Sequence, residues 1–113
     1  MSSTGENLAA IVLTTLGGDA DAAALARTLV EERLAACVNI LPPMTSIYRW
    51  QGAVEQEREQ QLVIKTAVHR IAALEARLRE LHPYAVPEFL VIRADGGSDA
   101  YLTWLVAETG GPT

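Results

Sequence analysis

Residues 45–66 read TSIYRWQGAVEQEREQQLVIKT, and this stretch decides the fold. Gln51-Gly52 is a turn signal between two runs that favour extended structure, so we expect a hairpin of strands at 45–50 and 53–66. Residues 36–41 indicate an earlier part of the first of these strands, which Pro42-Pro43 interrupts. Such a hairpin is longer than a small sheet needs, and its excess length must be covered.

The segment before the hairpin predicts a strand followed by a helix. Residues 9–13 form a continuous apolar run, typical of a strand central in a sheet, and Gly17-Gly18 ends it. We expect Asp19 to accept from the free N–H groups of the next helix. That helix carries apolar side chains at helical spacing, namely Ala22, Leu25, Ala26, Leu29 and Val30.

The segment after the hairpin predicts a second helix, a fourth strand and a terminal helix. Apolar residues over 71–81 mark the helix, a Glu75–Arg79 pair supports it, and Pro83 stops it. Residues 86–94 are expected to form the fourth strand. Ser98 is expected to cap a short final helix, over which Tyr101 and Trp104 share a packing face or, alternatively, stack on a ligand.

The element order is therefore β-α-β-β-α-β-α. We expect an α+β fold, a ferredoxin-like βαββαβ sandwich with a long hairpin between the second and third strands and an extra C-terminal helix. Both main helices then cover one face of the sheet, and apolar residues on the other face predict an oligomer. One domain is expected over 8–109, with a flexible N-terminal tail at 1–7 and a frayed C-terminus at 110–113.

Composition and charge narrow the functional class. The 113 residues carry a net charge of −5, and the nine basic residues are scattered. We therefore expect no nucleic-acid partner, because neutralising phosphates needs several cations on one face.

The apolar run at 8–14 is too short to span a bilayer, and the N-terminus lacks the features of a signal peptide. The single Cys agrees with a reducing compartment. The expectation is a cytoplasmic protein with no membrane partner.

Five blocks of sequence, in order, are typical of one family: LAACVN at 34–39, SIYRWQG at 46–52, LVIKT at 62–66, LHPYAVPE at 81–88 and YLTWL at 101–105. From about residue 10 to residue 107 the chain resembles the CutA family of divalent-cation tolerance proteins. The resemblance implies a homotrimer whose long hairpins pack between subunits. It also implies a cytoplasmic, non-enzymatic role in tolerance to copper and other divalent metal ions.

His82 and Cys37 are the candidate metal ligands, because imidazole and thiolate suit copper. The structural alternatives are a buried Cys in a strand and a His that satisfies a helix end. Some members of the family have a Cys on the first strand and two consecutive His before Pro-Tyr, whereas this chain has Thr14 and Leu81 at two of those positions. Copper, or another divalent cation, is therefore expected to bind weakly.

Other residues indicate a pocket near a subunit boundary. Glu55, Glu57 and Glu59 alternate along the third strand and either hold a hard cation or form a solvated, ion-paired edge. Lys65 is either a desolvated nucleophile or base or the partner of Glu59 or Glu88. The expected inter-subunit pocket, for a small anion or a metal, consists of Tyr48, Trp50, Glu59, Lys65, Tyr84 and Glu88. The same residue types also suit a structural interface network.

Two alternative functions stay open. The first is a trimeric small-ligand sensor or signalling protein that binds its ligand in the clefts between subunits. The second is an enzyme that uses Lys65 or a glutamate in such a cleft on a small acid.

Overall fold

The computed structural model describes residues 8–110. Its elements follow in the order β1 (Ala9–Gly17), α1 (Ala22–Glu31), β2 (Cys37–Ile40), β3 (Met44–Trp50), β4 (Ala53–Ala67), the 3-10 turn η1 (Val68–Arg70), α2 (Ile71–Leu81), β5 (Leu90–Arg93) and α3 (Asp99–Glu108). Over this range no helix has the length and apolar character needed to cross a membrane. The expectations for 1–7 and 111–113 lie outside the described residues.

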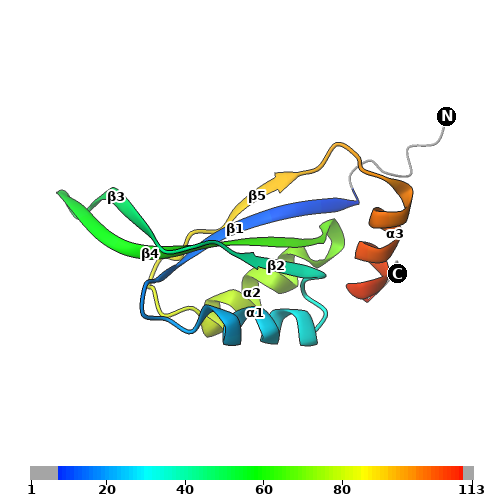
Figure 1. Ribbon diagram of the computed structural model, residues 1–113, viewed down its shortest axis with the longest axis horizontal. Helices are drawn as coiled ribbons and strands as arrows, with labels where there is room; N and C mark the ends of the chain where they lie inside the picture. The colour runs from blue at the N-terminus through cyan, green and yellow to red at the C-terminus, as the bar shows by residue number, and fades with distance from the viewer. Residues whose placement is uncertain (1–7, 111–113) are drawn as a thin grey trace.

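The strands form one antiparallel sheet in the order β2-β4-β1-β5, and β3 extends the sheet beside the outer half of β4. Both β2 and β3 pair with β4, with Cys37 opposite Lys65 and Met44 opposite Glu59. They are two parts of one strand, interrupted at the two prolines. The expected α+β fold is confirmed, the strand order is consistent with the ferredoxin-like arrangement, and Figure 1 shows the β3–β4 hairpin projecting beyond the helices.

The hairpin closes through a two-residue turn. Trp50 pairs with Ala53, and the residues between them, Gln51 and Gly52, have φ angles of 49° and 82°. Two successive positive φ angles give the turn the twist that matches the flanking strands, and glycine adopts this conformation without steric cost.

The core lies between one face of the sheet and the helices α1 and α2, which Figure 1 shows on the same side. Alternate residues of β1 and β4 point toward the helices, where Val12 and Ile64 are fully buried against Leu29 of α1 and against Leu74 and Leu78 of α2. The period of two in the strands and of 3.6 in the helices brings these side chains together.

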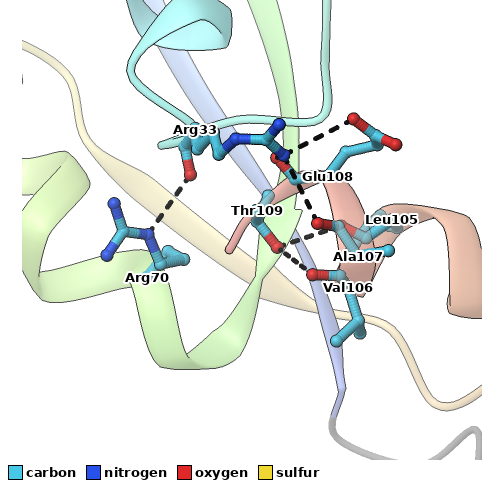
Figure 2. Close-up of polar contacts among 7 residues, drawn as sticks. All are labelled: Arg33, Arg70, Leu105, Val106, Ala107, Glu108 and Thr109. Carbon is cyan, nitrogen blue, oxygen red and sulfur yellow. Dashed lines mark hydrogen bonds and ion pairs between the residues drawn. The ribbon is translucent and has the colours of Figure 1, made fainter. Parts of the chain in front are cut away.

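The helix α3 packs at one end of the sheet, where Leu102 and Leu105 contact Ala9 and Ala67. Figure 2 shows how its C-terminus is held: the Arg33 guanidinium donates to the carbonyls of Ala107 and Glu108, at 3.5 and 3.3 Å. A cation at this end satisfies carbonyls that have no partner within the helix.

The second face of the sheet remains largely uncovered by the described chain. By register, Ile11 lies opposite Ile92 and Leu13 opposite Leu90, so these side chains share this face. Leu90 and Ile92 are 57% and 50% exposed. We call this apolar surface, with Val63, the open face.

Two local expectations were wrong. The α1 helix is capped by Asp21, whose carboxylate accepts from the Ala24 N–H at 3.0 Å, and not by Asp19. The fourth strand is only Leu90–Arg93, and most of the expected first half of 86–94 belongs to the loop that follows α2. This loop has side-chain contacts of its own, through Tyr84 and Glu88.

Candidate functional site

A cleft of about 650 Å³ lies between one face of the β3–β4 hairpin and the loop 84–88. The register of β3 and β4 places Ser46 opposite Glu57 and Tyr48 opposite Glu55, so side chains of both strands face the same side. Five of the six residues expected in a pocket line this cleft: Tyr48, Trp50, Glu59, Tyr84 and Glu88. Three aromatic rings and two carboxylates therefore meet there.

Tyr84 and Glu59 form the central contact of the cleft. The Tyr84 hydroxyl donates to Oε2 of Glu59 at 2.8 Å, and Glu59 is only 7% exposed. Burial, together with this hydrogen bond and the negative charge of Glu59, raises the pKa of Tyr84 to about 12. The pKa of Tyr48 is also raised, by burial first and then by the charges of Glu57, Glu59 and Glu55. Acidic residues thus set the electrostatic character of this surface.

The second carboxylate of the cleft, Glu88, is positioned by Gln61. The Gln61 amide donates to the Thr14 carbonyl at 2.7 Å and to Oε1 of Glu88 at 3.2 Å. The ion pairs found over residues 8–110 involve the helices and the loop after α1, and none reaches Glu59 or Glu88. Within the described chain, both carboxylates lining the cleft therefore lack a cationic partner.

Lys65, the sixth residue expected in the pocket, lies elsewhere. It is on the open face, opposite both Cys37 and Ile11, and does not line the cleft. It is six positions beyond Glu59 on the same strand, a separation of about 20 Å at the rise of an extended chain. Neither Glu59 nor Glu88 is within ion-pair distance of Lys65 in the described chain.

His82 is buried next to β1, with both ring nitrogens engaged. Nδ1 accepts from the Tyr84 N–H at 3.1 Å, so Nε2 carries the proton and donates to the Thr15 carbonyl at 2.6 Å. The imidazole thus anchors the start of the loop 84–88 to the sheet. A metal ion bound to either nitrogen must displace one of these hydrogen bonds.

Cys37 lies far from His82. Cys37 is level with Lys65 and Ile11 in the sheet, whereas His82 contacts Thr15, which is about 13 Å further along β1. Over residues 8–110 no three His, Cys, Asp or Glu side chains come together in an arrangement that could hold a metal ion. The two candidate ligands therefore do not share a preassembled site within this chain.

Sequence reasoning missed the polar and apolar floor of the cleft, formed by Thr15, Met44, Ser46, Gln61 and residues 85–87. Gln61 could have been found, because it shares the face of Glu59 at a spacing of two along the strand. Thr15 could not, since its place depends on the register between β1 and β4.

The family model described as CutA1 divalent ion tolerance protein matches residues 10–108. The chain belongs to the CutA divalent-cation tolerance family. A member from Thermus thermophilus, named divalent-cation tolerance protein CutA, is 48% identical over 100 residues, which are 88% of this chain and 97% of the relative. The resemblance seen in the sequence is thereby confirmed.

Solved structures agree with this family assignment. The divalent cation tolerance protein from Thermus thermophilus superposes with a TM-score of 0.87 at 47% identity, over 91% of this chain and all of that one. A CutA from Archaeoglobus fulgidus, described as a periplasmic divalent cation tolerance protein, gives a TM-score of 0.85 at 27% identity, over 90% of this chain and 99% of that one. The family name describes tolerance to cations and specifies no catalysed reaction.

Proposed function

We propose that this CutA-family chain acts as a non-enzymatic homotrimer in the cellular response to divalent metal ions. Membership of the family supports the link to cations. The single observation that supports assembly is the open face, on which Leu90 and Ile92 are half exposed to water. An apolar surface of this kind favours burial against copies of the same chain. Light scattering of the purified protein tests the assembly, and a monomeric mass contradicts it.

Copper or a similar divalent ion binds this protein weakly in our proposal, at His82 and, as a separate ion, at Cys37. Imidazole and thiolate are suitable donors for copper. Binding at His82 breaks a hydrogen bond to Thr15 or Tyr84, and Cys37 is too distant to contribute to the same ion. Both features reduce the affinity.

Calorimetric titration with Cu²⁺ tests this proposal. We expect weak binding that decreases in His82→Gln and in Cys37→Ser. The comparison variant is His69→Gln, because His69 is the other histidine of the chain and is exposed in η1; a larger decrease there than in His82→Gln places the bound copper at His69 instead. Absence of heat with the unmodified protein, or equal heat from His82→Gln, contradicts copper binding at this residue.

The cytoplasm is the proposed location. The single cysteine supports it, since proteins of oxidising compartments commonly carry paired cysteines. Fractionation of cells with markers for each compartment tests the location, and recovery with the periplasmic marker contradicts it.

A second candidate function is the binding of a small ligand in a cleft between subunits, as in a sensor or signalling protein. The cleft with its aromatic walls and buried Glu59 favours this function. A thermal-shift screen with nucleotides, small acids and small amines tests it. A melting temperature that no compound raises contradicts this candidate.

A further inference from the structure

We propose that the cleft between the hairpin and the loop 84–88 binds an organic ammonium ion, with its positive charge beside Glu59 and its alkyl groups against the rings of Tyr48, Trp50 and Tyr84. This inference rests on the second candidate function, a small ligand in the cleft, and names the chemical class of that ligand.

The first argument is the buried carboxylate of Glu59. It is 93% removed from solvent, and its carboxylate accepts a hydrogen bond from the hydroxyl of Tyr84. A hydrogen bond from a neutral phenol compensates only part of the cost of burying a charge. None of the ion pairs found over residues 8–110 supplies a cation to it. A positive ligand in the cleft provides the missing counter-charge.

The second argument is the charge of the whole lining. Among the residues that line the cleft, the ionic side chains are Glu59 and Glu88, and the lining contains no lysine, arginine or histidine. Glu57 and Glu55 continue the acidic surface along β4. Such a surface attracts cations and repels anions. A small anion, one of the ligands expected from the sequence, is therefore disfavoured.

The third argument distinguishes an organic cation from a metal ion. A hard metal ion needs several oxygen ligands within about 2.6 Å, whereas side chains at alternate positions of one strand are about 7 Å apart. Within the described range, no cluster of three potential ligands exists. Aromatic rings, in contrast, attract ammonium groups through their negative faces. Met44, Val86 and Pro87 add apolar lining for alkyl groups.

The test compares choline with its neutral isostere, in which a tert-butyl group replaces the trimethylammonium group. The two probes have nearly the same shape, so a difference in affinity reports the charge. Calorimetry with the full chain, in the assembly that it forms, should show choline binding at least about tenfold more tightly. Equal affinity for both probes overturns the proposal that the ligand is a cation, while the proposal that the cleft binds a small ligand remains valid. If neither probe binds while other compounds of the thermal-shift screen do, the ligand class is again wrong.

Charge-neutralising variants locate the site. Glu59→Gln keeps the size of the side chain and an acceptor for Tyr84, and we expect it to weaken choline binding by about tenfold without changing the binding of the isostere. Glu88→Gln is the second variant, at a less buried position, and should act in the same direction. Glu31→Gln is the matched control, because Glu31 is exposed on α1 and does not line the cleft. Unchanged choline binding in both cleft variants overturns the proposal.

Discussion

The phenol of Tyr84 and the carboxylate of Glu59 are joined by a 2.8 Å hydrogen bond that links the loop after α2 to the middle of β4. The contact joins residues 25 positions apart in the chain. Because His82 anchors the same loop to β1, two side chains fix one wall of the cleft against two different strands. The cleft is thus shaped by contacts within a single chain.

The contact predicts a specific dependence of stability on pH. The pKa of Tyr84 is raised from 10.0 to about 12 by burial and by Glu59, so between these values the folded state holds a proton that the unfolded chain has lost. The free energy of unfolding therefore falls as pH rises through this interval. We expect Tyr84→Phe to show a smaller fall, measured by urea unfolding on either side of pH 10. Tyr101→Phe, on α3, is the control. If the free energy of unfolding falls equally in the unmodified protein, in Tyr84→Phe and in Tyr101→Phe, the prediction is wrong.

The N-cap of α1 gives a second prediction. Asp21→Ala removes the carboxylate that accepts from the Ala24 N–H, and we expect it to lower the free energy of unfolding by about 1 kcal/mol. Asp19→Ala is the matched control, because Asp19 lies within the turn that the Ala20 N–H closes on the Gly17 carbonyl, before the cap, and its loss should change stability by less than about 0.5 kcal/mol. Urea unfolding of both variants measures the difference. A larger loss in Asp19→Ala contradicts the assignment of the cap.

The position of this cap marks the limit of what the sequence could predict. The strands, the hairpin and the two main helices follow from periodicity and from the turn signals, and all are present. The choice between Asp19 and Asp21 depends instead on a local turn, in which the Ala20 N–H donates to the Gly17 carbonyl at 3.0 Å and delays the start of the helix. Two candidate caps two residues apart cannot be distinguished by residue preference alone.

The candidate site was predictable in part for a related reason. The pocket residues on β3 and β4 share a face because side chains alternate along strands, and a sequence reveals that alternation. The same alternation places Lys65 on the face of Glu59, but the six positions between them on one extended strand put it about 20 Å away, a separation that the expected strand at 53–66 already implied. The shortened fourth strand has a different cause. Pro87 has no N–H for a strand ladder, and the Glu88 carboxylate in the loop accepts from the Gln61 amide of β4.

The buried hydroxyl of Thr14 leads to a third prediction. Its Oγ1 is buried and has no hydrogen-bond partner among the described residues. Thr14→Val replaces the hydroxyl with a methyl group of similar size, and we expect the free energy of unfolding to rise by roughly 1 kcal/mol. Thr66→Val is the matched variant, since the Thr66 hydroxyl donates to the Leu34 carbonyl at 2.7 Å. The Thr66→Val variant should be less stable by about 1 kcal/mol. Thermal or urea unfolding measures both variants, and a change in the free energy of unfolding with the same sign in both contradicts the argument.

An exposed apolar residue midway along β3 gives the last prediction, which concerns the proposed assembly. Ile47 on β3 is 67% exposed in the single chain, so Ile47→Asp costs the chain itself little. In an oligomer that covers the hairpin, the same substitution buries a carboxylate in an apolar contact, and we expect a monomeric or aggregated protein by light scattering. Thr45→Asp places the same charge on the same side of β3, opposite Arg58, and should retain the assembly. An oligomer of unchanged mass and thermal stability in Ile47→Asp would show that the hairpin surface is not part of the interface.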